Sequence, residues 1–288
     1  MTIEQLSVVI PAYRAGGTIT RAVESARNAG AAHVIVVDDG SDDDTALQAE
    51  TAGAVVYRQT NAGASLARVL GAKHVTTDYI IFLDADDELI PEGVSASVRR
   101  LEENPGLVVA AGTVIGVGTD GNERPFPVRF DPVNTETLLT VGHGPWPPCA
   151  AVVRRSAYER TPELDPPPLA PRYAEDYELL IRLSLSGAID VRDQPTCRYS
   201  LAGGKSVNSA RSAIEAKEQL RSYYAQFLNI DIVLMSERRL AMAARARRAR
   251  AHWSSGEKSE AATQMIKWVA TDPSYALRKL ASKPWKRN

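Results

Sequence analysis

The sequence predicts an α/β fold: a Rossmann-like domain with a central, mostly parallel (mixed) sheet flanked by helices, plus a C-terminal α-helical extension. Strand-like and helix-like segments alternate from residue 6 to residue 112, polar clusters follow several of the strands, and the pattern beyond residue 209 is helical. Such alternation is typical of βαβ units with helices on both faces of a sheet. We therefore expect an α/β domain over residues 1–208 and a helical extension over residues 209–288.

The bulk composition is that of an ordinary globular protein. Of 288 residues, 44% are hydrophobic and 24% are charged, which excludes a fibrous or disordered chain. Cys149 and Cys197 are too few and too far apart for a disulfide framework or a CxxC metal site, which fits a reducing cytoplasm. A polar N-terminus that leads into a strand predicts no signal peptide, and no apolar run is long enough to span a membrane. We expect a cytoplasmic protein.

The first strand and helix set the pattern of the domain. Leu6–Pro11 is a continuous apolar run rich in β-branched residues, which predicts a buried strand. Residues 18–29 carry apolar side chains at helical spacing, with Thr18 as the expected N-cap. By the same criteria, strands are expected at 33–38, 54–57, 79–83 and 107–112, and helices at 44–52, 65–74 and 92–103.

The rest of the domain is less regular. Residues 120–148 are rich in proline and are expected to form an irregular surface loop over the site. A strand is expected at 150–154 and a helix at 173–185, capped by Gly187. Gly116–Gly121 matches a Gly-rich dinucleotide fingerprint, but the prolines after it cannot open a helix, so a turn between two strands is expected. In the extension, helices are expected at 210–228, 236–253 and 258–270.

Polar clusters stand at the ends of three expected strands. Tyr13 and Arg14 follow the first strand, Asp38 and Asp39 end the second, and the segment 84–86 ends the fourth. Ligands of open α/β sheets bind in the crevice at the carboxyl ends of the strands. The clusters therefore predict one site at that edge of the sheet.

The acidic run at 82–88 (FLDADDE) carries the sharpest chemical signal. A hydrophobic strand delivers Asp84 and Asp86, separated by one residue, to its carboxyl end. Mg²⁺ and Mn²⁺ prefer oxygen ligands and share them with substrate phosphates, where they neutralise a departing diphosphate. The alternative is an acidic helix start, which the helix dipole also favours.

Two further acidic pairs have both a chemical and a structural interpretation. Asp39 could accept a hydrogen bond from a pyrimidine ring N–H, although Asp-Gly-Ser at 39–41 is also ordinary turn chemistry. Glu175 and Asp176 could supply a general base for an attacking hydroxyl, although acidic residues in a first helical turn are common without such a role.

Taken in order, these motifs resemble the family 2 glycosyltransferases of the GT-A fold. The resemblance covers roughly residues 6–205. The segments that carry it are VVIPAY (8–13), VVDDGSDD (36–43), NAGASLAR (61–68), FLDADDEL (82–89) and YAEDYELLIRL (173–183). It implies an inverting enzyme that uses a nucleotide-sugar, commonly with Mn²⁺ or Mg²⁺.

The resemblance also implies roles for individual residues. Asp86 would ligate the metal, and Asp176 would be the catalytic base with Glu175 in support. The nucleotide-sugar would contact Pro11, Ala12, Tyr13, Asp39, Arg68, Asp84 and Ala85. The donor would be a UDP- or dTDP-sugar, since Asp39 accepts equally from uracil and thymine, and the acceptor would be a glycan or another hydroxyl compound.

The sequence departs from the family pattern at two places. Val69 stands where the family often has Asn after the arginine of the third motif. The stretch 198–204 lacks the histidine that many members carry late in the domain, so either Lys205 or Ser206 replaces it or fewer groups hold the diphosphate. A catalytically degenerate domain that acts as a nucleotide-binding or scaffold module stays open for that reason. A Mg²⁺-dependent phosphatase is disfavoured, because Glu88 stands where that chemistry uses Thr or Val.

Charge is unevenly distributed along the chain. Residues 236–288 hold 13 Lys and Arg against 4 Asp and Glu, while the remainder is acidic. A helix with Arg245, Arg247, Arg248 and Arg250 could pack on the catalytic domain, form a homodimer contact, or lie peripherally on an anionic membrane, which would suit a lipid-linked acceptor. Packing is favoured, and no nucleic-acid module accompanies the charge, so no nucleic-acid partner is expected.

Two aromatic residues of the Pro-rich loop have open roles. His143 could touch the acceptor, but a loop histidine is more often simply solvated. Trp146 could stack on a sugar ring or anchor the loop.

Overall fold

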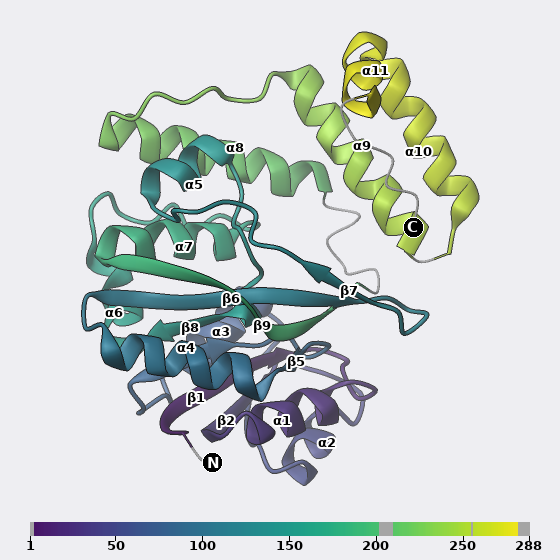
Figure 1. Ribbon diagram of the computed structural model, residues 1–288. Coiled ribbons are helices and arrows are strands. Elements are labelled where there is room, and N and C mark those ends of the chain that lie inside the picture. The colour runs from purple at the N-terminus through teal and green to yellow at the C-terminus, as the bar shows by residue number, and fades with distance from the viewer. Residues whose placement is uncertain (1–2, 202–209, 255, 282–288) are drawn as a thin grey trace. The chain divides into compact units, whose positions relative to one another are not determined.

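The computed structural model describes residues 3–201, 210–254 and 256–281 (Figure 1). The chain divides into two compact units. The first holds residues 1–200 apart from two short segments, and the second holds residues 201–288 together with those segments, 118–121 and 171–174. The expected boundary between residues 208 and 209 lies outside the described residues.

The first unit is built on a nine-stranded mixed sheet with the order β3-β2-β1-β4-β8-β6-β9-β5, to which β7 adds by pairing with β6. The strands are β1 (Ile3–Ala12), β2 (Ala31–Asp38), β3 (Val55–Arg58), β4 (Tyr79–Phe82), β5 (Glu88–Leu89), β6 (Leu107–Val117), β7 (Glu123–Phe126), β8 (Ala151–Arg154) and β9 (Ala188–Ser200). The helices are α1 (Ile19–Asn28), α2 (Thr45–Thr51), α3 (Ala64–Ala72), α4 (Pro91–Glu103), α5 (Thr135–Val141), α6 (Arg155–Arg160) and α7 (Glu175–Ser186), with short 3₁₀ turns η1 (Pro148–Ala150) and η2 (Thr161–Glu163).

The sheet joins a parallel half to a mixed half. β3, β2, β1 and β4 run parallel to one another, as the alternation of strands and helices predicts. β8 is antiparallel to both β4 and β6, and β6 is parallel to β9. The Rossmann-like, mixed α/β prediction is therefore confirmed.

Side chains alternate between the two faces of the parallel strands and fill two core layers. In β1, Val8 and Ile10 pack with α1, α2 and α4, whereas Val9 packs on the other face with α3, α6 and α7. β2 and β4 alternate in the same way. A strand that is buried on both faces needs apolar residues throughout, so these strands are unbroken hydrophobic runs in the sequence.

The region between residues 120 and 148 is more ordered than expected. It contains β7, which forms a hairpin with β6, and α5, so the prediction of a wholly irregular loop is wrong. Asn134 caps α5 by accepting from the backbone N–H of Thr137, a capping box with threonine where the sequence signature has Glu or Gln. The hairpin confirms the predicted turn after Gly116.

The long strand β9 was not predicted. Pro195 and a high content of charged residues lower its strand signal, since proline cannot donate to a sheet ladder. Two predicted caps stand at the expected positions but lack the expected capping geometry. Thr18 is the N-cap residue of α1, but its side chain makes no capping hydrogen bond, and its hydroxyl donates to the Ala15 carbonyl instead. Gly187 is not left-handed; a Cβ there would meet Val108, so the glycine permits close packing.

The second unit consists of α8 (Ala210–Leu228), α9 (Glu237–Ser254), α10 (Lys258–Thr271) and α11 (Pro273–Ala281), which agrees with the three predicted helices and adds α11. Arg238 and Arg245 of α9 donate to backbone carbonyls in the last turn of α10, at Thr271 and Lys267. The Arg239 guanidinium lies 3.6 Å from the centre of the Tyr275 ring. Part of the basic charge is thus used inside this unit. Among the described helices, none is long and apolar enough to cross a bilayer.

Candidate functional site

The ends of β1, β2 and β4 meet at one edge of the sheet, as predicted. Ala12 pairs with Asp38, and the backbone N–H of Asp39 donates to the Ala12 carbonyl at 2.8 Å. On the other side of β1, the N–H of Leu83 donates to Val9 at 3.0 Å. Tyr13, Asp39 and Asp84 therefore leave the sheet at the same edge.

Asp39 is buried and holds the loop that precedes α3. Its Oδ1 accepts from the Ala62 backbone at 2.7 Å and from Gln59 Nε2 at 2.8 Å, and its Oδ2 accepts from the Gly63 backbone at 2.9 Å. These contacts tie the end of β2 to the start of the NAGASLAR segment. Two motifs joined by contacts across 23 and 24 residues of sequence thus form one wall of the site.

The neighbouring Asp38 is fully buried and serves the fold. Its carboxylate accepts from Arg58 Nε at 2.8 Å and from the Ser41 backbone at 3.0 Å, so it closes the turn after β2. On the facing loop, Arg14 has a left-handed backbone (φ 50°), and its N–H donates to Ser41 Oγ. Tyr13, between these loops and β1, is half-buried.

Arg68 links two motifs that lie far apart in sequence. Its Nη2 donates to Asp84 Oδ1 at 2.6 Å, and its Nη1 donates to Glu175 Oε1 at 3.3 Å. The Arg68 side chain is only 14% exposed. Burial disfavours its charged form, but the carboxylates of Asp84 and Glu175 outweigh that effect and raise the pKa of Arg68 above its ordinary value. The Nε of Arg68 is buried and makes no hydrogen bond to any described residue.

The acidic pair at the start of α7 has two different environments. Glu175 is half-buried, and the loss of solvation, followed by the neighbouring Asp176 charge, raises the pKa of its carboxyl. Asp176 is exposed. Glu178, one residue further into the helix than Tyr177, is buried and accepts from the backbone of Leu169 and Ala170, so this third acidic residue stabilises the preceding loop.

The acidic turn after β4 carries Asp84, expected to contact the nucleotide-sugar, and Asp86, the expected metal ligand. The side chain of Asp84 is 37% exposed, and Asp86 is exposed on the accessible surface. Nevertheless, the pKa of Asp86 is raised, first by desolvation in the crowded turn and then by the Asp84 charge. Two carboxylates that repel each other and offer only oxygen ligands fit a hard divalent cation such as Mg²⁺ or Mn²⁺. Ala85, between them, is buried.

Asp87 was not predicted as a functional residue. It is almost fully buried, and desolvation raises the pKa of its carboxyl from 3.8 to about 8. Cys149 and Cys197 are buried free thiols beside it, and burial also raises the pKa of both. No sequence signal could group these three residues, because they come from separate segments of the chain.

The comparisons with known proteins agree with this arrangement of motifs. Residues 7–161 match the family described as Glycosyl transferase family 2. The chain belongs to glycosyl transferase family 2. This confirms the resemblance drawn from the ordered motifs.

Individual relatives resemble parts of this family 2 chain. It is 39% identical over 94 residues to the uncharacterized glycosyltransferase YibD of Escherichia coli K12, over 30% of this chain and 27% of that protein. It is 33% identical over 118 residues to an undecaprenyl-phosphate 4-deoxy-4-formamido-L-arabinose transferase of Klebsiella pneumoniae, over 37% of this chain and 36% of that protein. The chain thus spans well under two thirds of the length of these relatives.

A solved structure shares the fold. S. aureus TarS 1–349 in complex with UDP-GlcNAc aligns with a TM-score of 0.61 and 19% identity, over 94% of this chain and 82% of that chain. This likeness supports the GT-A fold expected from the sequence.

Two positions were expected to replace the histidine that many family 2 members carry late in the domain. Lys205 and Ser206, at these positions, lie outside the described residues. Trp146 is half-buried and packs against both core layers, which favours its role as an anchor over a role in sugar stacking. His143 contacts the Gly144 carbonyl and the edge of the Phe130 ring.

Proposed function

We propose that the protein is an inverting glycosyltransferase that moves a sugar from a nucleotide-sugar to an acceptor hydroxyl in one metal-dependent displacement. One observation carries the proposal most strongly. The Arg68 guanidinium contacts both Asp84, beside the proposed metal ligand, and Glu175, beside the proposed base. A single displacement needs a leaving-group site and a base at fixed positions relative to each other. The two contacts of Arg68 would hold these positions.

The nucleotide would lie along the wall formed by the ends of β1 and β2. Pro11, Ala12 and Tyr13 would line the pocket for the base and ribose. Asp39 Oδ2 accepts one hydrogen bond from the Gly63 backbone, and a carboxylate oxygen has room for a second, from the ring N–H of uracil or thymine. A UDP- or dTDP-sugar is therefore the proposed donor class.

The diphosphate would lie over the acidic turn. Asp86 would ligate Mn²⁺ or Mg²⁺, with Asp84 and Ala85 against the nucleotide-sugar. When bound, the cation would neutralise the negative charge that develops on the departing nucleoside diphosphate. Arg68 holds Asp84 in place and adds a fixed positive charge next to the same region.

Asp176 is the proposed base. It is exposed at the first turn of α7, next to Glu175, whose carboxylate is engaged by Arg68. Asp176 would remove the proton from the acceptor hydroxyl as its oxygen attacks the anomeric carbon, opposite the leaving diphosphate. Attack from that side inverts the anomeric centre.

The acceptor is proposed only as a class. The Klebsiella relative is named for an undecaprenyl-phosphate substrate, which supports a lipid-linked acceptor beside the glycan class expected from the sequence. The TarS structure contains UDP-GlcNAc, which supports a UDP-sugar donor. A lipid-linked acceptor would suit a cytoplasmic enzyme that touches the inner face of the membrane through its basic C-terminal helices. A homodimer contact through those helices is the alternative, and we keep the division into a catalytic domain (1–208) and an extension (209–288).

Calorimetric titration with UDP, dTDP and GDP, each with and without Mn²⁺, tests this proposal. We expect one pyrimidine diphosphate to bind, Mn²⁺ to tighten its binding, and Asp86→Ala to remove the effect of Mn²⁺. Glu50→Ala, which removes an exposed carboxylate from α2, is the matched control and should behave as the wild type. If no nucleotide binds under any condition, the proposal is wrong.

The second candidate is a nucleotide-binding or scaffold module without catalysis. The missing late histidine is the observation that favours it. Nucleotide binding without any turnover of donor sugars, including slow hydrolysis, would support this module over the enzyme.

A further inference from the structure

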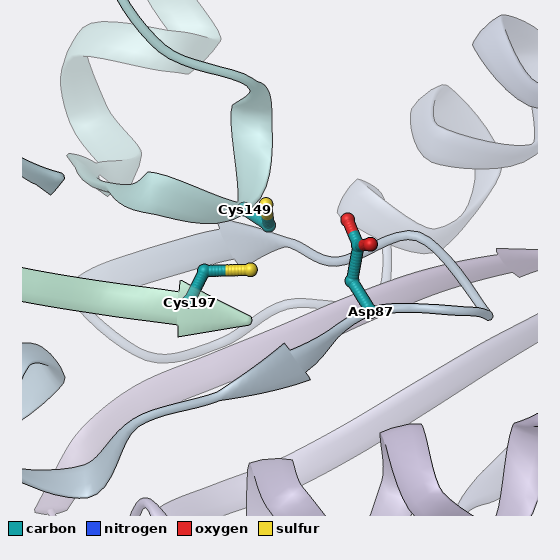
Figure 2. Close-up of side chains that lie close together, drawn as sticks. All are labelled: Asp87, Cys149 and Cys197. Carbon is teal, nitrogen blue, oxygen red and sulfur yellow. The ribbon is translucent and has the colours of Figure 1, made fainter. Parts of the chain in front are cut away.

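Asp87, Cys149 and Cys197 form a buried cluster behind the acidic turn (Figure 2). Their carboxylate oxygen and two sulfur atoms all lie within 4.8 Å of one another. Asp87 belongs to the turn after β4, Cys149 to η1, and Cys197 to β9. The exposed fractions of the three residues are 1%, 2% and 0%. Three separate segments therefore bring metal-ligating groups to one enclosed point.

Asp87 has one carboxylate oxygen without a hydrogen bond. Its Oδ1 accepts from the Ser200 backbone at 2.8 Å, whereas its Oδ2 is buried and makes no hydrogen bond to any described residue. Figure 2 shows the Asp87 carboxylate beside Cys149, with the Cys197 sulfur extending from β9 toward Asp87. The nearby Cys149 thiol is only a weak hydrogen-bond donor, so it compensates little for the hydrogen bond that Asp87 Oδ2 lacks. A buried carboxylate oxygen left in this way is costly, and a cation would satisfy it.

The ligand set differs in kind from the one at the surface of the same turn. Asp84 and Asp86 offer oxygen only, which suits Mg²⁺ and Mn²⁺. Two sulfur atoms and one carboxylate suit a softer cation, and Zn²⁺ accepts both ligand types. With bonds of about 2.0–2.3 Å, ligand atoms of a tetrahedral zinc centre lie roughly 3–4 Å apart, within the spread of this cluster.

We propose that Asp87, Cys149 and Cys197 bind a thiophilic divalent cation, with Zn²⁺ as the probe, at a structural centre separate from the Asp84–Asp86 pair. Binding releases the two thiol protons and the proton of the Asp87 carboxyl to solvent, and three protein ligands leave one position for a small ligand such as water. The bound cation joins the acidic turn to η1 and to the end of β9. It therefore fixes the backbone that presents Asp86.

Titration of reduced, metal-free protein with Co²⁺ tests the site directly, because cobalt–thiolate bonds absorb in the near ultraviolet. We expect one equivalent of Co²⁺ to develop this absorption and Zn²⁺ to abolish it by displacement. Cys149→Ala and Cys197→Ala should each lose the absorption, whereas Asp86→Ala should keep it. The proposal is overturned if the wild type develops no thiolate absorption, or if the absorption survives the loss of both cysteines.

Thermal unfolding provides a second readout that does not depend on catalysis. Zn²⁺ should raise the Tm of the wild type and of Asp86→Ala, but not that of Cys197→Ala, with circular dichroism to verify that each variant is folded. An equal rise in all three would place Zn²⁺ elsewhere and overturn the proposal. If a cysteine variant does not fold, the cobalt spectra of the wild type and of Asp86→Ala still decide. Manganese-dependent nucleotide binding is measured separately, so this proposal and the proposed function can fail independently.

Discussion

Arg68 Nη2 lies 2.6 Å from Asp84 Oδ1, and the same guanidinium reaches Glu175 with its other terminal nitrogen. A planar, always-charged fork can bind two carboxylates at once, which a lysine ammonium cannot do with comparable geometry. Arg68 thereby fixes the spacing between the acidic turn and the first turn of α7. It acts as a positioning residue for both.

Replacement of Arg68 should uncouple the two acidic segments. We expect Arg68→Lys to keep the positive charge but to lower donor turnover by about 10- to 100-fold, because one ammonium cannot hold both carboxylates. Arg68→Ala should also lower the free energy of unfolding by about 1–2 kcal/mol, a range reduced from that of a fully buried pair because Asp84 is more than a third exposed. Arg14→Lys, in the exposed pair with Asp42, is the control and should unfold as the wild type does. Equal activity of Arg68→Lys and wild type would contradict the positioning role.

The two carboxylates at the start of α7 should respond differently to amidation. Asp176→Asn is expected to lower kcat by about 10²–10⁴-fold with an unchanged KM for the donor, as for loss of a general base. Glu175→Gln should weaken the contact with Arg68 and cause a smaller loss, since Glu175 supports rather than carries the proton transfer. Steady-state kinetics of both variants measure this difference. A larger loss of kcat in Glu175→Gln than in Asp176→Asn would identify Glu175 as the general base.

Burial of Asp87 should make stability depend on pH when no metal is bound. Its pKa is raised to about 8, while the unfolded chain titrates near about 3.9. Between about pH 4 and pH 8, the folded state therefore holds a proton that the unfolded state has lost, and its stability falls as pH rises, by at most about 1.4 kcal/mol per pH unit. The raised pKa values of Asp86 and Glu175 act in the same direction.

Denaturant unfolding with EDTA at a series of pH values measures this dependence. Asp87→Asn cannot ionise and should flatten the slope, and the difference between this variant and the wild type gives the contribution of the Asp87 carboxyl alone. A wild-type protein whose stability rises through this range, or an unchanged slope in Asp87→Asn, would show that the carboxyl is ionised in the folded state.

Gly93 marks a close approach between α4 and β9. A Cβ at this position would overlap the Pro195 carbonyl and come within 2.7 Å of Thr196 Cα, both of which are backbone atoms that cannot turn away. We expect Gly93→Ala to lower the free energy of unfolding by about 1–3 kcal/mol through overpacking. At Gly106, after the same helix, nothing lies within 4 Å of an added Cβ, so Gly106→Ala should be nearly neutral. Similar denaturation midpoints for both variants would contradict the close approach.

Much of the first half of the fold could be predicted because the signals for its strands and helices lie within short segments of the chain. Strands β1, β2 and β4 are buried on both faces, so their hydrophobic runs stand out, and the helices between them show apolar residues at helical spacing. The mixed half was harder to predict. β9 contains Pro195 and charged residues, and it becomes a strand only because β6 and β5 lie beside it. α11 carried a usable signal, since Asp272 before Pro273 caps its first turn through the Tyr275 N–H.

By itself, the sequence determined which carboxylates end the strands and that these ends share one edge, because parallel strands must place their carboxyl ends together. Only the tertiary structure decided that Arg68 contacts Glu175, 107 residues further along the chain. The grouping of Asp87 with Cys149 and Cys197 also depended on the tertiary structure. The physical reason is that motif order follows from chain direction and local periodicity. Contacts across the fold, in contrast, depend on how closely whole elements pack, and no single segment encodes that packing.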